Sequence, residues 1–445
     1  MNSIAVALRG KGFRKLLSRG TRILQRYGLT AAKVDREMDR FVDLLHRFEC
    51  GATWPITTVA LKRNPEIIEG YQAQGIEFAV HGYRHEDYSQ LSAAEQLTEL
   101  RQARRVFEQV GVQLQGFRSP YLRWNEDTRT ALRQEGLIYD SSQGLAWDVL
   151  DGQRTAAYEH VLGFYGALPA ADYPSLPGLE GDLVCIPYSL PDDEALVERL
   201  DLETQTEKGD IWLKVLRHTY ELGELFTLGL HPERTTLCLE PLEAVLTRAR
   251  QLEPAVWIAR LDEIARWWRS RAEAVVEVTD AADGGLRLTV EGPGGVTVLA
   301  RSVEVDASTI PWADGYRHVR AATFTVRAPL RPFIGLAPDA SPRLASFLRQ
   351  QGYIVETSNC RGAPTDVVLS TNVVCSQSPN SYSHYFDQTE FAPEHERPLL
   401  VKIEKSDRPL VRLGRWPDGA RSALAVTGDI DALTVWDYAS RFLGR

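Results

Sequence analysis

The chain has 445 residues, a length typical of two or three domains. Its 44% apolar and 25% charged residues are ordinary for a folded protein and exclude wholesale disorder. Lys and Arg number 51 against 60 Asp and Glu, and the resulting net charge of −9 argues against nucleic acid as a general partner.

The sequence offers no segment that we expect to enter a membrane or to direct secretion. No apolar stretch approaches the roughly 20 residues of a membrane-spanning helix. The apolar run 4–8 is too short for a signal peptide. Five separated cysteines without a C-x-x-C pair favour a reducing compartment: Cys50, Cys185, Cys238, Cys360 and Cys375. We therefore expect a cytoplasmic protein.

The N-terminal segment is basic, because no acidic residue precedes Asp35. Its cations include Arg9, Lys11, Arg14, Lys15, Arg19, Arg22 and Arg26. A solvated helix face is one interpretation. Contact with anionic lipid or with a phosphorylated substrate is the other.

Between about residues 35 and 270, short apolar runs alternate with helical segments. The predicted strands are 52–59, 76–80, 112–117, 137–139, 183–187, 225–230 and 255–258. Asn64-Pro65 predicts a helix start, with Asn64 as N-cap, and a capping box at 92–95 starts a helix that runs toward Gly111. A further helix is predicted over 125–135. This alternation favours parallel strands with helical crossovers, in a barrel or an open sheet.

The pattern changes after residue 274. The runs 286–290 and 296–299 flank Gly-Pro-Gly-Gly at 292–295, which predicts a hairpin, and 323–326 predicts another strand. We predict a β-α-β unit from strands at 333–336 and 353–355 and a helix at 341–351, with a further strand at 366–369. No G-x-G-x-x-G accompanies this unit, so we expect no dinucleotide site there.

Four groups of polar residues directly follow predicted strands, where parallel α/β folds collect their functional residues. The first is the pair His81 and His85, whose H-x-x-x-H spacing suits a Zn, Co or Ni ion, although two surface histidines would look the same. The second is the turn Arg118-Ser119-Pro120-Tyr121, in which Arg118 offers a fixed cation to a carboxylate. Such turns are also common on surfaces.

The third group is His231, which ends a buried run; a lone histidine there is more often a core residue than a catalyst. The fourth is Asp429 and Asp431, which follow the run 423–426 as D-x-D. One metal ligand and one general base would use this arrangement, and solvated acids at a strand end are the alternative.

Taken together, these groups resemble the polysaccharide deacetylase family, the NodB-homology carbohydrate esterases. That family has paired acids after a strand, then H-x-x-x-H, then R-x-P-Y, and finally Leu-x-His. The chain supplies His81/His85, Arg118 to Tyr121 and Leu230-His231 in family order. The resemblance covers about residues 35–270. It implies a distorted (β/α) barrel of the polysaccharide deacetylase type.

The position of the paired acids departs from the family pattern. Family members carry them before the histidine pair, whereas here Asp429 and Asp431 come near the C-terminus. We interpret this as a circular permutation, in which the C-terminal strand completes the barrel beside 52–59. The rival interpretation is that 423–445 is the stub of a second copy.

The predicted organisation follows from this interpretation. Residues 1–273 form the main part of the barrel, 274–328 a small inserted antiparallel β module and 329–410 an α/β unit. Residues 411–445 supply the strand and helix that complete the barrel.

The resemblance implies a role for each group. Asp431, His81 and His85 would hold one divalent metal, Zn first, with Co or Ni as alternatives. Asp429 would be the general base and Arg118 the cation that orients it. The Tyr121 backbone N–H would stabilise the oxyanion. His231 would protonate the leaving amine, with Asp140 holding its imidazole charged.

The implied substrate is an N-acetylated saccharide or its precursor. Hydrolysis of another C–N bond, in a formyl group or cyclic amide, remains an alternative, as does a non-catalytic carbohydrate-binding relative. Trp124, Trp147 and Tyr188 suit either sugar stacking or core packing. Asp192-Asp193 suits either a substrate hydroxyl or a helix N-cap.

Overall fold

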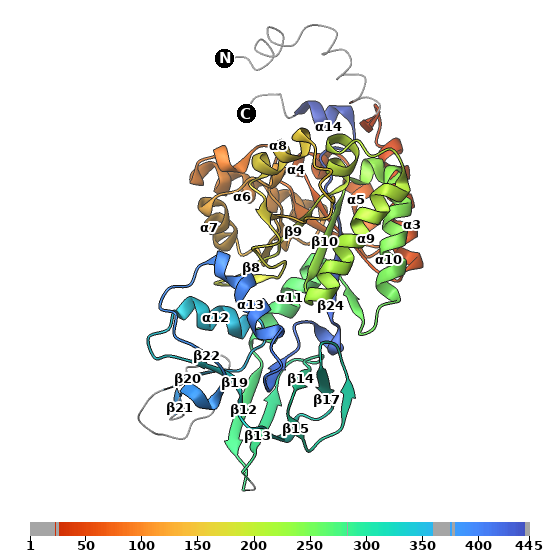
Figure 1. Ribbon diagram of the computed structural model, residues 1–445. Helices are drawn as coiled ribbons and strands as arrows, with labels where there is room; N and C mark the ends of the chain where they lie inside the picture. Colours follow the sequence, from red (N-terminus) through yellow and green to blue (C-terminus); the bar gives the residue numbers. More distant parts are fainter. Residues whose placement is uncertain (1–22, 24–25, 283, 359–373, 376–378, 441–445) are drawn as a thin grey trace.

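A curved parallel sheet forms the centre of the protein in the computed structural model (Figure 1), which describes residues 23, 26–282, 284–358, 374–375 and 379–440. Its strands lie in the order β10-β24-β1-β2-β3-β4-β8-β7, and β11 also pairs with β24. All pairs are parallel except β7 with β8. The strand bounds are β1 Thr53–Ile56, β2 Glu77–Val80, β3 Gly116–Phe117, β4 Tyr139–Asp140, β7 Gly178–Glu180, β8 Leu183–Cys185, β10 Leu225–Leu230, β11 Val256–Ile258 and β24 Ser422–Gly428.

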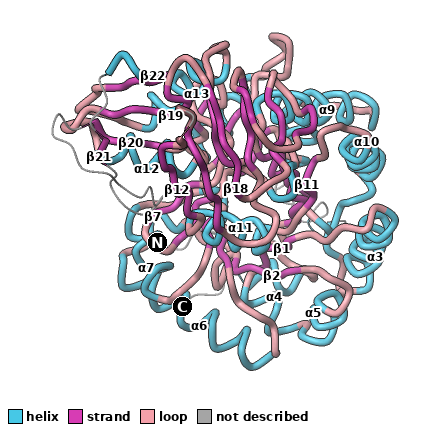
Figure 2. Tube along the Cα trace, turned by 90° about the horizontal axis from the view of Figure 1, so that it is seen from below, coloured by secondary structure: helices cyan, strands magenta, loops and turns pink. Residues whose placement is uncertain are grey.

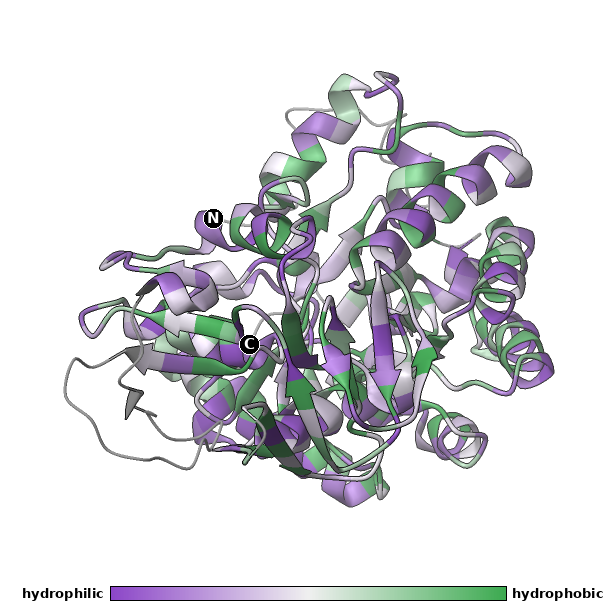
Figure 3. Cartoon of the chain, turned by 60° about the horizontal axis from the view of Figure 1, so that its bottom comes forward, coloured by the Kyte–Doolittle hydropathy of each residue, from purple (hydrophilic) through white to green (hydrophobic). Residues whose placement is uncertain are grey.

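Helices cover the outside of this sheet, as Figure 2 shows for α3, α5, α6 and α7. The helices of this part are α3 Ala32–Arg47, α4 Thr58–Arg63, α5 Pro65–Gln72, α6 Ala93–Val110, α7 Glu126–Gln134, α8 Ala156–Tyr165, α9 Gln205–Leu222, α10 Leu239–Arg250, α11 Leu261–Ala272 and α14 Val435–Ala439. A small sheet of β5 Gly144–Ala146, β6 Leu168–Pro169 and β9 Tyr188–Leu190 accompanies them. Figure 3 shows hydrophobic and hydrophilic residues mixed along the surrounding helices, as in helices that cover a core with one face. The expected α/β barrel is therefore present, as an open, curved sheet.

Local signals explain the helix starts. The capping box at Ser92 is formed as predicted, since Ser92 and Glu95 satisfy each other's backbone N–H groups. Pro65 is the first residue of α5, also as predicted. The predicted side-chain cap by Asn64 is wrong, because its amide instead donates to the Ala60 carbonyl and to Asp437. Asn64 thus joins α4 to the C-terminal segment.

The C-terminal strand β24 lies between β10 and β1. It pairs with the whole of β10, from Leu225↔Ala423 to Leu230↔Gly428, and with β1 at Thr53↔Thr427. Every residue of β24 is buried. β24 is therefore an inner strand of the sheet and not a stub outside it.

Two further units pack below the amino-terminal ends of the strands (Figure 1). The first consists of two antiparallel sheets, β12-β13-β18-β15 and β16-β17-β14-β23. Their bounds are β12 Val275–Asp280, β13 Leu286–Glu291, β14 Val298–Arg301, β15 Glu304–Val305, β16 Thr309–Pro311, β17 Tyr316–Val319, β18 Thr323–Arg327 and β23 Leu410–Leu413.

The predicted hairpin across Gly292–Gly295 is wrong, because β13 and β14 belong to different sheets. β13 instead forms a hairpin with β12, and its alternating side chains contribute to the same small core. β23 also corrects the predicted boundary at 411. It pairs with β14 in this unit, so only the segment from β24 onward completes the barrel.

The second unit has four parallel strands in the order β21-β20-β19-β22. The elements are β19 Arg331–Leu336, α12 Pro342–Gln350, β20 Val355–Ser358, β21 Val374–Cys375, β22 Tyr382–Phe386 and α13 Glu396–Glu404. The predicted β-α-β unit is confirmed by the parallel pairing of β19 with β20 around α12. The predicted strand at 366–369 and the basic residues 9–22 lie outside the described residues. No helix in the described ranges is both long and apolar enough to cross a bilayer.

A buried carboxyl at the amino-terminal end of β2 gives the fold a pH dependence. Glu77 accepts hydrogen bonds from Thr53 Oγ1 (2.5 Å) and the Tyr139 hydroxyl (2.8 Å). Burial, and secondly the nearby Asp262 carboxylate, raise the pKa of Glu77 well above its ordinary value of 4.5. The folded state thus binds a proton that the unfolded state releases, so this group's contribution to stability falls as the pH rises above 4.5.

We expect Glu77→Gln to flatten the loss of stability between about pH 5 and about pH 8. The thermal midpoint of the variant minus that of the wild type should be roughly 2–4 °C larger at about pH 8 than at about pH 5. Thermal unfolding followed by circular dichroism at both pH values measures this difference. Glu277→Gln, at an exposed position of β12, is the matched control. An identical pH dependence in wild type and Glu77→Gln would contradict the assignment.

Candidate functional site

The four predicted groups meet at the carboxyl ends of the central strands. Because β10, β24, β1, β2 and β3 are successive parallel neighbours, the residues that follow them share one edge of the sheet. A pocket of about 270 Å³ opens at this edge. Its lining includes His81, His85, His231, Asp429 and Asp431.

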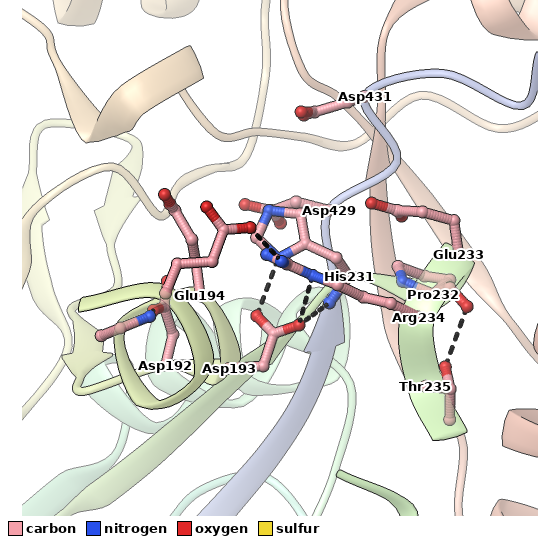
Figure 4. Close-up of polar contacts among 12 residues, drawn as sticks. Asp192, Asp193, Glu194, His231, Pro232, Glu233, Arg234, Thr235, Asp429 and Asp431 are labelled. Carbon is pink, nitrogen blue, oxygen red and sulfur yellow. Dashed lines mark hydrogen bonds and ion pairs between the residues drawn. The ribbon is translucent and has the colours of Figure 1, made fainter. Parts of the chain in front are cut away.

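The D-x-D segment is held by backbone hydrogen bonds on both sides. Asp429 N donates to the Leu230 carbonyl (2.9 Å), and Ile430 N donates to the Pro55 carbonyl (2.7 Å). On this extended backbone the two acids share one face, while Ile430 between them is fully buried. Figure 4 shows both acids on the segment that follows β24. The close packing requires Gly428, since a Cβ there would lie 2.7 Å from Pro232 and 2.8 Å from Trp54.

His81, His85 and Asp431 form a cluster with the chemistry of a metal site. One ligand atom of each lies within 4.8 Å of the others. The two Nε2 atoms lie 3.6 Å (His81) and 3.1 Å (His85) from Asp431 Oδ1. Two imidazoles and a carboxylate are a donor set that suits Zn²⁺.

The surroundings of His81 favour ligation by its Nε2 atom. Its Nδ1 lies 2.9 Å from the Arg118 carbonyl oxygen, which is an acceptor, so Nδ1 carries the proton and the Nε2 lone pair faces Asp431. Burial lowers the pKa of His81, although Asp429 and Asp431 oppose this effect. The neutral ring that a metal requires is therefore favoured, and the residues fit the predicted divalent metal.

Arg118 is fully buried and holds the Asp429 carboxylate in place. Its Nη1 donates to Asp429 Oδ1 (2.6 Å) and to Thr427 Oγ1 (2.9 Å). Its Nε donates to the Ser141 carbonyl (3.1 Å), and the Tyr188 ring lies 4.5 Å from its guanidinium carbon. With this many contacts, Arg118 is a fixed cation beside Asp429, as the sequence predicted.

His231 is held by Asp193. Its Nδ1 lies 2.7 Å from Asp193 Oδ1, and its backbone N donates to Asp193 Oδ2 (3.0 Å), as the dashed lines in Figure 4 show. Burial acts to lower the pKa of His231, but the Asp193 carboxylate overrides it and the pKa rises to about 10. His231 is therefore an imidazolium at neutral pH, with Nε2 left to donate a proton.

Asp140 does not hold His231, so that prediction is wrong. Its carboxylate accepts from Ser142 Oγ and lies 3.5 Å from Arg129 Nε of α7. Side chains alternate between the faces of a strand, and Asp140 faces α7 while the following Ser141 contacts Arg118. The sequence signal for the correct residue was the acidic pair after β9. Asp192 accepts from Ala195 N, which is the cap-like role, and Asp193 contacts His231.

Tyr121 lies beside the metal-ligand cluster. Its ring centroid is 4.3 Å from that of His85, and its backbone is left-handed, with φ 59°. Such a backbone costs about 1–3 kcal/mol in a non-glycine residue and is typical of functional sites. Of the aromatic residues with two interpretations, Tyr188 and Trp147 are buried, and the Arg129 guanidinium lies 3.6 Å from the Trp124 ring centroid. Trp147 therefore belongs to the core, whereas Tyr188 packs in the core and also lines the pocket.

Sequence reasoning missed the N-terminal contribution to the pocket. Arg26, which precedes α3 in the sequence, lines it and pairs with Glu233. Tyr165 and Glu194 also line it, and the Tyr165 hydroxyl donates to Glu194 (2.7 Å). The run of cations signalled anion contact in general but gave no way to identify Glu233 as the partner.

Comparisons with known proteins find, in part of the chain, the family that the four groups of residues resemble. Residues 33–139 match the family model for polysaccharide deacetylase. A peptidoglycan deacetylase-like protein from Gibberella zeae is 30% identical over 118 residues, which are 24% of this chain and 35% of that protein. The chain thus spans about a third of the length of this curated relative.

Solved structures show partial similarity. A probable polysaccharide deacetylase from Pseudomonas aeruginosa PAO1 aligns with a TM-score of 0.42 and 24% identity, over 52% of this chain and 73% of that one. PuuE allantoinase aligns with a TM-score of 0.42 and 22% identity, over 52% and 72%. Residues 33–139, which carry His81, His85, Arg118 and Tyr121 in the family's order, therefore match the polysaccharide deacetylase family.

Proposed function

We propose that the chain is a metal-dependent hydrolase that removes N-acetyl groups from an amino sugar of a saccharide or of its precursor. The observation that carries the proposal is the convergence of three units on one pocket. They are the His81/His85/Asp431 cluster, the Arg118–Asp429 pair and the Asp193–His231 pair. A site that only bound sugar would have no use for all three.

His81, His85 and Asp431 would hold one divalent ion, with Zn²⁺ first and Co²⁺ or Ni²⁺ as alternatives. Such an ion, when bound, polarises a carbonyl group and makes a bound water more acidic. The two histidines follow β2 and Asp431 follows β24, so the ion would join two segments that lie far apart in the sequence.

Asp429 takes the proton from the attacking water in this proposal. Its Oδ1 is held by Arg118 Nη1 at 2.6 Å, which orients the carboxylate at the pocket. The backbone N–H of Tyr121, a residue whose ring lies beside His85, would donate to the oxygen that becomes negative during attack.

His231 supplies the proton that the leaving amine needs. With Nδ1 engaged by Asp193, the ring presents Nε2–H to the pocket. Its pKa of about 10 keeps this proton in place at neutral pH. Base and acid are thus separate residues, and each is held by its own charged partner: Asp429 by Arg118 and His231 by Asp193.

The place of β24 supports the circular permutation as part of the proposal. The paired acids of this chain follow an inner strand that pairs with both β1 and β10, although that strand comes last in sequence. The chain thereby obtains from its C-terminal segment the acids that the family resemblance places before the histidine pair.

The test is acetate release by the purified full-length protein. We expect acetate from β-1,4-linked N-acetylglucosamine oligomers, activity lost after dialysis against a chelator, and recovery when Zn²⁺, Co²⁺ or Ni²⁺ is added. The same protein should leave N-formyl and cyclic-amide substrates largely intact. Full activity after complete metal removal, or hydrolysis of only the formyl or cyclic amides, would overturn the proposed function.

A further inference from the structure

The turn of residues 231–235 begins with the proposed catalytic acid and packs against the segment that carries the proposed base. We call it the acid turn. Pro232 lies so close to Gly428 that a Cβ on this glycine would be 2.7 Å from the proline ring. Gly428 directly precedes Asp429, whose backbone N donates to the Leu230 carbonyl (2.9 Å). A shift of the acid turn would therefore displace both the acid and the base.

The acid turn carries a buried carboxylate, Glu233, which Figure 4 shows on the same turn as His231. The Glu233 side chain is fully buried, and its Oε1 accepts a hydrogen bond from Arg26 Nε (2.6 Å). Its Oε2 is buried without a hydrogen bond from any described residue. The neighbouring cation of the turn, Arg234, is engaged elsewhere, since it pairs with Asp193 (3.2 Å) and with Glu198 (2.6 Å). Arg26 is therefore the cation that stabilises the Glu233 carboxylate.

Arg26 comes from a segment that lies before the region 33–139 that matches the family model. Its guanidinium is partly exposed and lines the catalytic pocket. The next residue, Tyr27, packs its ring against Tyr438 of α14, with centroids 5.6 Å apart. The segment that carries Arg26 is thus held by the C-terminal helix, which follows the two acids of the site.

We propose that Arg26 is a positioning residue of the catalytic site, which pairs with Glu233 and thereby fixes the acid turn and the place of His231. This inference rests on the proposed function and adds to it a residue from outside the family-matching region. A buried carboxylate that loses its cation must take up a proton or turn toward water, and turning would move the acid turn. Arg26 acts through Glu233 and needs no contact with the substrate.

The first test is Arg26→Met, which removes the guanidinium and keeps a long side chain. With the β-1,4-linked tetramer of N-acetylglucosamine as probe, we expect kcat to fall about 10- to 100-fold, the cost of misplacing a catalytic group by about 1 Å. KM should change little, because the substrate loses no contact. Arg26→Lys keeps a cation beside Glu233 and should recover part of kcat. Arg47→Met, at an exposed ion pair with Glu243, is the matched control and should leave kcat unchanged.

The double variant Arg26→Met/Glu233→Gln separates positioning from direct contact with the substrate. It contains neither the cation nor the buried carboxylate, so nothing drives the acid turn out of place. We expect its kcat to return to within about threefold of the wild type, although each partner has been lost. A double variant as slow as Arg26→Met, or a raised KM in both, would mean that Arg26 acts on the substrate itself and would overturn the inference.

Hydrogen exchange tests the same inference without turnover. Measured by mass spectrometry, the peptide that covers residues 229–238 should exchange faster in Arg26→Met than in the wild type, and at the wild-type rate in the double variant. If the wild type releases no acetate, the proposed function falls, whereas this exchange pattern still decides whether Arg26 fixes the acid turn. Equal exchange in wild type and Arg26→Met would overturn the inference, whatever the kinetics.

Discussion

Replacing Asp429 by Asn is expected to lower kcat by about 10²- to 10⁴-fold, the contribution typical of a positioned general base. The metal content should stay at the wild-type value, because Asp429 is not part of the His81/His85/Asp431 cluster. The fold should persist, since Arg118 keeps its contacts with Thr427 and Ser141. Steady-state kinetics and metal analysis by mass spectrometry measure the two effects.

Asp431→Asn is the informative partner of this variant. It removes the only carboxylate of the cluster and should weaken metal binding, so activity should rise again when excess Zn²⁺ is added. Added Zn²⁺ should not rescue Asp429→Asn. Asp280→Asn, on the exposed end of β12, controls for the loss of one carboxylate. If excess metal rescued Asp429→Asn and not Asp431→Asn, the two roles would be reversed.

The second large effect is expected for Asp193→Asn. Without the carboxylate, burial and the nearby Arg234 would leave the pKa of His231 below its ordinary value of 6.5. The imidazole would then be neutral at pH 7 and unable to protonate the leaving amine. We expect kcat at pH 7 to fall by about 10²-fold or more.

The pH profile tests the cause of this loss. In the wild type, the protonated form of His231 is lost as the pH rises through about 10, so activity should decline on that side. In Asp193→Asn the same decline should move below about pH 6.5. Asp192→Asn changes the neighbouring carboxylate, which contacts Tyr188 and Ala195 and not His231. In this variant the activity should decline at the same alkaline pH as in the wild type, even if kcat differs. An unshifted limb in Asp193→Asn would show that Asp193 does not set the charge of His231.

Features that depend on a few neighbouring residues could be predicted from the sequence, because such a short pattern has one physical meaning. The capping box at Ser92 formed because its two partners are three residues apart and need no help from the rest of the fold. Apolar runs followed by His81, Arg118, His231 and Asp429 predicted strand ends, and parallel pairing brings all of these ends to one edge.

Predictions from the sequence were wrong where two segments were both able to supply the same contact, such as a paired strand or the carboxylate beside His231. The Gly-Pro-Gly-Gly turn suited a hairpin, but β13 pairs with β12 and β18, whose side chains complete its core, while β14 pairs with β17 and β23. Likewise Asp140 ends the strand β4 and Asp193 follows the strand β9. Asp140 is turned toward α7, and only Asp193 reaches the His231 ring.

By itself, the sequence determined which functional groups exist and that each would stand at the end of a strand, because hydrophobic runs and their polar termini are properties of neighbouring residues. Which carboxylate meets which ring depends on the order of the strands in the folded protein. The tertiary structure inserted the last strand of the chain between β10 and β1 and thereby brought Asp431 to His81 and His85. The reason is that contacts between residues hundreds of positions apart depend on strand order and on the face to which each side chain points, and neither is encoded in local spacing.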